Sequence, residues 1–212
     1  MVHCHAQLCG VQHQRPTHDA DLVVEIQGSS YVDSALALSE LGYEVKESPN
    51  IFAHVHRFVR GDSDVVDLMV PDRQRSRQRF KGREVVSVPG ASSALKRTIA
   101  FRLEGGEEIR IPDLASAISL KSAAYFMPGA NRERHLQDVV TLLACLGRTE
   151  ILPPPSKSMK KNIVKIIPSL SAPQAWSVCM PEDRGRAIFA ARRLNPEWAT
   201  PEFLVPKRPG RR

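Results

Sequence analysis

The sequence has no long apolar run and no cysteine framework, and both absences limit the class of protein. No stretch of about 18 apolar residues occurs in the chain, so we expect no membrane span. The first ten residues have no basic stretch followed by an apolar core, and we expect no signal peptide. The four cysteines lack the spacing of a disulfide framework, which favours a reducing, cytoplasmic compartment.

Acidic residues are scarce in the last part of the chain. Residues 153–212 hold 12 lysines and arginines against 4 acids, whereas residues 1–152 hold 18 against 19. A basic excess confined to one region predicts a polyanionic partner, most simply nucleic acid. For the terminal PKRPGRR a solvated tail is an equally good interpretation. We favour the nucleic-acid partner for the segment that carries Lys157, Lys160, Lys161 and Lys165.

The order of the predicted elements indicates an α/β (α+β) protein. Alternating and β-branched runs predict strands at 21–26, 54–60 and 64–71, with further short strands before residue 112. Apolar spacing and capping residues predict helices at 29–42, 111–126, 133–147, 157–171 and 181–194. We expect a mixed sheet with flanking helices over residues 1–150, followed by a basic helical region over residues 151–212. PPPSKS at 153–158 is the clearest linker.

Three aspartates are candidate metal ligands. Asp19 and Asp21 are two residues apart at the start of a predicted strand, so both carboxylates project from the same face. Asp67 lies inside the otherwise apolar strand DVVDLMV, where an acid is unusual. Carboxylates on neighbouring strands would form an oxygen-rich site suited to Mg²⁺. Alternatively, D-x-D arises often by chance, and Asp19 could cap a turn.

A lysine and an aspartate stand out in the two central helices. Lys121 follows the apolar stripe of Leu114 and Ile118, where an ammonium needs an anion such as phosphate or carboxylate. A lysine extending from the edge of the stripe is the simpler alternative. On the next helix, Asp138 could pair with Lys121 or act as a base. Arg134 lies in the first turn of that helix, where anions bind readily.

Together these segments resemble the AbiEii-like toxins of the nucleotidyltransferase superfamily, which occur in toxin–antitoxin and phage-defence systems. The resemblance covers roughly residues 5–150. It is carried by RPTHDADLVVEI at 15–26, HRFVRGDSDVVDLMVPD at 56–72 and LKSAAYFMPGANRERHLQDVVTLLACL at 120–146. Any one segment is weak evidence, but their order and intervals are fairly specific.

The resemblance implies a nucleotidyltransferase fold that transfers a nucleoside monophosphate from a nucleoside triphosphate to RNA. The acceptor would be transfer RNA, and a cognate antitoxin would hold the enzyme in check. Asp19, Asp21 and Asp67 would bind Mg²⁺, and Lys121 and Arg134 would bind the nucleotide phosphates. Asp138 would orient the acceptor or act as its base.

The N-terminus departs from the family pattern. His3 and Cys4 stand where the family has a glycine turn that holds phosphate, so we expect transfer to be weak or absent. A zinc site at His3, Cys4, His5 and Cys9 is a further possibility, although we favour a mobile N-terminus. The sequence also permits an inactive RNA- or nucleotide-binding module, a plain partner-binding protein, or nucleotidyl transfer to small cations, which the basic charge disfavours.

Overall fold

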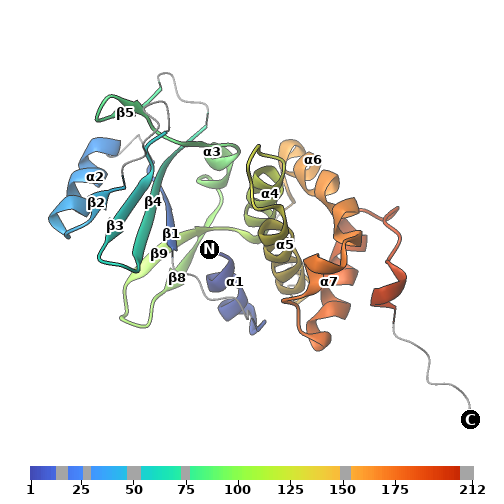
Figure 1. The fold of residues 1–212 in the computed structure, drawn as a ribbon. Helices are drawn as coiled ribbons and strands as arrows, with labels where there is room; N and C mark the ends of the chain where they lie inside the picture. Colours follow the sequence, from blue (N-terminus) through green and yellow to red (C-terminus); the bar gives the residue numbers. More distant parts are fainter. Residues whose placement is uncertain (13–18, 26–29, 47–53, 73–76, 149–153, 206–212) are drawn as a thin grey trace, which may run out of the picture. The chain divides into compact units, whose positions relative to one another are not determined.

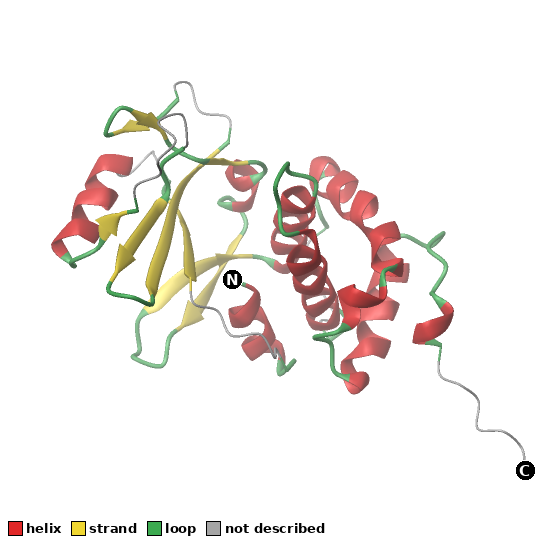
Figure 2. Cartoon of the chain, in the orientation of Figure 1, coloured by secondary structure: helices red, strands yellow, loops and turns green. Residues whose placement is uncertain are grey.

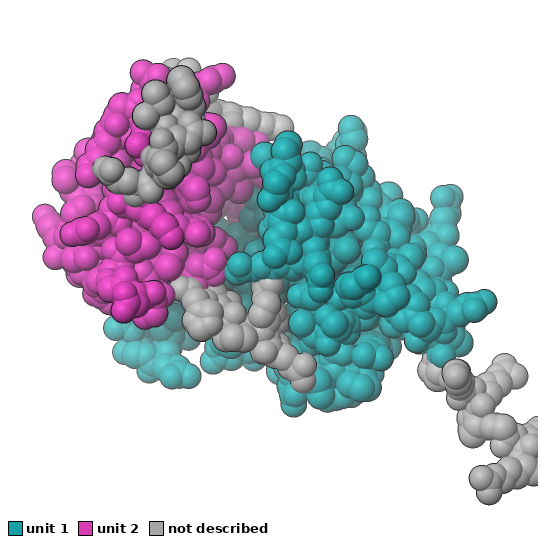
Figure 3. Space-filling model, viewed as in Figure 1, with its two compact units in different colours: residues 1–15, 98–212 teal, residues 16–97 magenta. Residues whose placement is uncertain are grey.

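The computed structural model describes residues 1–12, 19–25, 30–46, 54–72, 77–148 and 154–205 (Figure 1). The chain divides into two compact units, which we call the sheet unit, Pro16–Arg97, and the helical unit, Met1–Arg15 with Thr98–Arg212 (Figure 3). Strands and helices occur in both (Figure 2), and the predicted mixed α/β class is confirmed.

The sheet unit is built on parallel and antiparallel strands. β1 (Asp19–Val23) runs parallel to β4 (Asp64–Pro71), and β3 (Arg57–Arg60) pairs with β4 antiparallel. β2 (Glu44–Val45) extends the sheet beyond β3, so that the order is β1-β4-β3-β2. The end of β4 also pairs with a short parallel strand, β7 (Ser87–Val88). The smaller elements of this unit are β5 (Arg79–Phe80), β6 (Arg83–Glu84) and α3 (Ala91–Ala94).

Helix α2 (Tyr31–Glu40) covers one face of this sheet. Ser30 and Asp33 form a capping box at its start, in which each side chain accepts a hydrogen bond from the other residue's backbone N–H. Tyr31 is buried in the same core cluster as Phe58 and Leu68 of the sheet. Because successive strand residues face opposite sides, the neighbours of Phe58 and Leu68 in sequence face away from α2.

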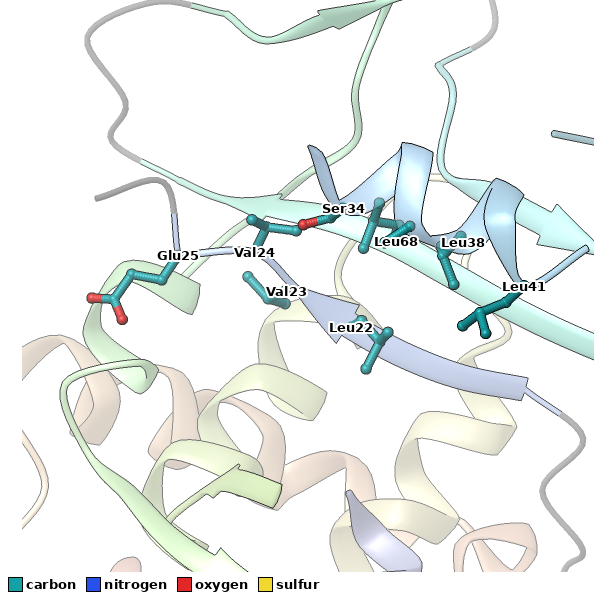
Figure 4. A pocket seen from close by; sticks show the side chains of 9 residues that line it. Leu22, Val23, Val24, Glu25, Ser34, Leu38, Leu41 and Leu68 are labelled. Atoms are coloured by element: carbon teal, nitrogen blue, oxygen red, sulfur yellow. The ribbon is translucent and has the colours of Figure 1, made fainter. Parts of the chain in front are cut away.

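A hollow of about 570 Å³ lies between β1 and α2 (Figure 4). Its lining is mainly aliphatic, with Leu22 and Val24 of β1 and its extension, Leu38 and Leu41 near the end of α2, and Leu68 of β4. Strand alternation sets Leu22 on the side opposite to Asp21. The hollow therefore belongs to the face of the sheet that does not carry the candidate carboxylates.

The helical unit buries a large apolar core around α5 (Arg132–Leu146), whose residues from Val139 to Leu146 are all buried. The other elements of this unit are α1 (Val2–Cys9), the hairpin β8 (Thr98–Arg102) and β9 (Glu108–Pro112), α4 (Leu114–Tyr125), α6 (Lys157–Ile166) and α7 (Pro181–Leu194), with three 3₁₀ turns, Ile167–Ser171, Pro173–Trp176 and Glu202–Leu204. Asp113 caps α4 by accepting a hydrogen bond from the backbone N–H of Ser116.

The boundary between the compact units differs from the one predicted at residue 150. The buried side chains of α6 and α7 join those of α4 and α5 in a single core. α5 and α7 approach so closely that a Cβ added at Gly147 would lie 2.6 Å from the backbone oxygen of Arg186. The predicted linker spans residues 153–158, and Lys157 and Ser158 belong instead to the first turn of α6. The basic tail 206–212 lies outside the described residues.

The prediction of a mobile N-terminus is wrong. Residues 2–9 form helix α1, which buries Val2, His5 and Ala6. His5 Nε2 donates a 2.8 Å hydrogen bond to the carbonyl oxygen of Pro112. Arg148 donates to the carbonyl oxygen of Cys9 at 2.6 Å, which satisfies an open acceptor at the helix end. Long-range contacts of this kind leave little trace in a short sequence with weak periodicity.

Strand and helix boundaries otherwise lie close to the predicted ones. The predicted hairpin of 54–60 and 64–71 is confirmed, although its first strand begins at Arg57. The expected helix at 157–171 becomes α6 followed by a 3₁₀ turn, because Pro168 cannot continue an α-helical hydrogen-bond ladder. Among the described residues, no helix has both the length and the apolar character needed to cross a membrane.

Candidate metal centre

The pairing of β1 with β4 brings the three candidate aspartates together. Asp21 is the register partner of Asp67, and Asp19 lies two residues earlier on β1. Oxygen atoms of the three carboxylates lie within 4.8 Å of one another. We predicted that the carboxylates would converge on one face of adjacent strands, and this geometry is confirmed. Parallel pairing produces it because side chains in register on neighbouring strands point to the same face.

The donor set fits a hard divalent cation. An ion about 2.1 Å from each of two oxygens can bridge atoms up to roughly 4.2 Å apart, so only small side-chain rotations are needed. Asp21 is exposed, Asp19 is half-buried and Asp67 is buried at 7% exposure. The site thus combines a fixed carboxylate with two that remain accessible to ligands from solvent. Carboxylate oxygens suit hard cations such as Mg²⁺, Ca²⁺ or Mn²⁺.

Arg57 places a positive charge against this cluster. Its Nε donates to one oxygen of Asp67 at 2.7 Å, and its terminal NH2 nitrogen donates to the other at 2.6 Å. These hydrogen bonds, then the negative charge of Asp67 and the more distant charges of Asp19 and Asp21, raise the pKa of Arg57. A bidentate arginine is geometrically specific, so it fixes the orientation of Asp67. Asp67, an unusual acid in an apolar strand, thus has Arg57 as its structural partner.

Sequence reasoning missed Arg57, although a signal was present. In a hairpin, residues equally far from the turn face each other, and Arg57 and Asp67 are equidistant from Asp62. Arg60 and Asp64 form a second pair of the same symmetry, with a 2.7 Å ion pair. The exposed carboxylate of Asp64 therefore has a structural partner and needs no metal.

Lys121 and Asp138 form an ion pair inside the helical unit. The Lys121 ammonium lies 3.0 Å from a carboxylate oxygen of Asp138, with side-chain exposures of 16% and 0%. α4 and α5 position the two groups side by side, because Lys121 continues the stripe of Leu114 and Ile118 that packs toward α5. Of the two roles considered for Asp138, pairing with Lys121 is the one that the structure contains.

The remaining candidates do not join the carboxylate cluster. Lys121, Asp138 and Arg134 belong to the helical unit, whereas the cluster belongs to the sheet unit. Their joint action on one nucleotide stays a prediction. Arg134 is half-buried near the start of α5, where its backbone N–H donates to the side chain of Asn131.

His3 and Cys4, which stand where the family has its glycine turn, lie within helix α1 and form no turn. Among the described residues, the aspartate cluster is the one group of three or more side chains found with metal-ligand geometry. His3, Cys4, His5 and Cys9 therefore form no zinc site of this kind. All four residues lie along helix α1. The imidazole of His5 already forms a hydrogen bond with the carbonyl oxygen of Pro112.

Comparison of the chain with protein-family models, with characterised proteins and with solved structures finds no match. The resemblance to AbiEii-like nucleotidyltransferases therefore stays a prediction that rests on the motif residues.

Proposed function

We propose that this protein is a nucleotidyltransferase that moves a nucleoside monophosphate from a nucleoside triphosphate to an RNA acceptor. The observation that carries the proposal is the convergence of Asp19, Asp21 and Asp67, with oxygens within 4.8 Å, on adjacent parallel strands. Mg²⁺ bound there would neutralise triphosphate charge and lower the pKa of the attacking hydroxyl. In the reaction, the acceptor oxygen bonds to the α-phosphorus, the bond from that phosphorus to the β-phosphate oxygen breaks, and pyrophosphate leaves.

The residues around the cluster have distinct roles in this proposal. Asp19 and Asp21 hold the metal from one strand, and Asp67 completes the set from β4 with its orientation fixed by Arg57. By resemblance, we assign phosphate binding to Lys121, whose ammonium is paired with Asp138 inside the helical unit. Arg134, near the start of α5, adds a second cation for phosphate.

An RNA acceptor is supported by the charge of the C-terminal region. Residues 153–212 carry a balance of +8, and Lys157, Lys160, Lys161 and Lys165 are all exposed on α6. Such a surface attracts a polyanion and repels the cationic small molecules that related transferases modify. By resemblance, we propose that the acceptor is transfer RNA and that the protein is the toxin of a toxin–antitoxin pair in the cytoplasm.

A catalytically impaired RNA- or nucleotide-binding module is the second candidate. It is favoured by one observation, that His3 and Cys4 lie in helix α1 and offer no glycine turn to the phosphates. Each charge-assisted hydrogen bond lost from the phosphates costs about 1.5–3 kcal/mol. Two such losses would lower the rate roughly a hundredfold or more.

The decisive experiment incubates the protein with each labelled nucleoside triphosphate and total transfer RNA, with and without Mg²⁺. We expect Mg²⁺-dependent labelling that Asp21→Asn abolishes. Asp64→Asn is the matched control, because it makes an equally conservative change in the exposed pair with Arg60. Binding of Mg²⁺ and nucleotide without labelling would identify the impaired module. No binding of Mg²⁺ at all would overturn the proposal.

A further inference from the structure

An aromatic pair at the end of α4, the half-buried Tyr125 and the exposed Phe126, lies beside cations from two other elements. Tyr125 and Phe126 pack edge to face with ring centres 4.9 Å apart, and Phe126 is 37% exposed. The Lys165 ammonium lies 3.7 Å from the centre of the Phe126 ring. The Arg132 guanidinium lies 5.8 Å from the centre of the Tyr125 ring. Each of the two rings therefore has a cation beside it.

Lys165 is the last member of a lysine stripe along α6. Lys157, Lys161 and Lys165 recur every four residues, so they lie on one helical face at intervals of about 6 Å. The opposite, apolar face of α6 is buried, and it contacts α4 through Met159 and Asn162. All three lysines are exposed, and α6 contains no acid.

The lysine stripe has no partner of opposite charge in the parts of the chain that the structure describes. There, no carboxylate forms an ion pair with Lys157, Lys161 or Lys165. The stripe therefore keeps its full positive charge for a ligand. The stripe adjoins the rings within one compact unit, because Lys165 contacts the Phe126 ring.

We propose that this lysine–aromatic surface, made of Lys157, Lys161, Lys165, Arg132, Tyr125 and Phe126, binds single-stranded RNA. The inference rests on the proposed function, and it assigns this surface to the unpaired end of the RNA acceptor. The cations contact successive phosphates, and a base stacks on the exposed Phe126 ring as Lys165 moves from the ring to a phosphate. Duplex RNA would satisfy only the cations, because its base faces are hidden in the helix. An acidic protein would likewise bind through the cations and would make no use of the exposed Phe126 ring.

The test measures binding of a fluorescent oligouridine of about 12 nucleotides, within the usual site size for single strands, to the full chain over a range of salt, without nucleotide or Mg²⁺. In one variant, Lys157, Lys161 and Lys165 are all changed to Gln. Its matched control changes three exposed cations elsewhere, Lys81, Arg102 and Arg192, and so has the same net charge. Phe126→Ala is paired with Phe203→Ala, a ring that is 47% exposed.

We expect the triple lysine variant to lower the slope of log affinity against log salt by about 2, at about 0.7 per lost contact. The control triple should change the slope much less. Phe126→Ala should weaken oligouridine binding about fivefold or more, the lower end of measured base stacking. Neither Phe203→Ala on oligouridine nor Phe126→Ala on heparin, a polyanion without bases, should have this effect.

Equal losses in the two triple variants, or no effect of Phe126→Ala on oligouridine, would overturn the proposal. Tighter binding of poly-glutamate than of oligouridine would also overturn it, in favour of an acidic protein partner. Since no step of the test needs catalysis, RNA binding without labelling of transfer RNA leaves this surface supported while the transferase proposal fails. Circular dichroism of each variant excludes loss of folding as the cause of weak binding.

Discussion

Replacing Arg57 by glutamine separates the structural and metal-binding roles of the aspartate cluster. Arg57 donates two hydrogen bonds of 2.6–2.7 Å to Asp67, and the charges of Asp19 and Asp21 also act on its guanidinium. A divalent cation would perform the same electrostatic task. Arg57→Gln should therefore lower the free energy of unfolding of the metal-free protein. It should also raise the affinity of the protein for a divalent cation.

The loss of stability follows from the two hydrogen bonds. Hydrogen bonds to charged groups contribute about 1.5–3 kcal/mol. The Arg57 side chain is 40% exposed, so solvent screening reduces the expected loss for the pair to about 1–2 kcal/mol. Asp67, whose side chain is only 10% exposed, is left beside Asp19 and Asp21 without the guanidinium that faces it.

The gain in metal affinity follows from removing a repulsion. A divalent cation and a guanidinium about 6 Å apart repel by about 1.4 kcal/mol even at the dielectric constant of water. Arg57→Gln should therefore bind Mg²⁺ or Mn²⁺ about tenfold more tightly. Saturating metal should then restore the stability that the substitution removed, because a ligand at about 100 times its Kd adds about 2.7 kcal/mol.

Calorimetric titration with Mg²⁺, spin-resonance titration with Mn²⁺, and urea unfolding with and without metal measure these effects. Arg60→Gln is the matched control, since it removes the same charge from the same hairpin at a pair with 49% and 46% exposed side chains. Arg60→Gln should lower the free energy of unfolding by less than about 1 kcal/mol and leave the metal affinity nearly unchanged. If Arg57→Gln binds metal no more tightly than the unmodified protein, the guanidinium does not compete with a cation and the reasoning fails.

Three further outcomes are expected from the helical unit. Gly147→Ala should lower the free energy of unfolding by about 1–3 kcal/mol because the methyl group meets the backbone of α7. Gly185→Ala, in open space on α7, should instead raise it by roughly 0.5–1 kcal/mol. Changes of the same sign for the two variants in urea unfolding would contradict this. Burial lowers the pKa of His5, so the unfolded state takes up its proton first and stability should fall as the pH drops below about 6.5. His5→Gln should flatten that loss between about pH 7.5 and 5.5, a window that brackets the ordinary histidine pKa, and an unchanged profile would rule out the assignment. Lys121→Met leaves the carboxylate of Asp138 buried without its cation and should cost about 3 kcal/mol or more, measured against the double variant with Asp138→Asn, which should recover part of it.

Local sequence patterns predicted much of the fold and the position of the carboxylates. The D-x-D at Asp19 and Asp21 needs only strand alternation to share a face, and the turn at Gly61 defines the hairpin that carries Asp67. The helices α4 and α5 follow from apolar periodicity, a capping aspartate and a terminal glycine. These signals act within a few residues, so the chain reveals them without its tertiary structure.

Other features depended on partners far away in sequence. Helix α1 has weak periodicity of its own, and it is fixed by contacts of His5 with Pro112 and of Cys9 with Arg148. The division into units fell at residues 15 and 97 rather than 150, because the apolar faces of α6 and α7 are buried against α4 and α5. A linker composition does not reveal which core the following helices will join.

For the site, the sequence by itself determined which carboxylates can act together, since alternation and hairpin symmetry fix their faces. Only the tertiary structure decided how their charge is compensated. Arg57 reaches both oxygens of Asp67, and Lys121 reaches Asp138, at distances that depend on strand register and helix packing. A sequence shows which side chains are charged. The energy of each charge depends on its neighbours and its burial, and these are set only in the folded chain.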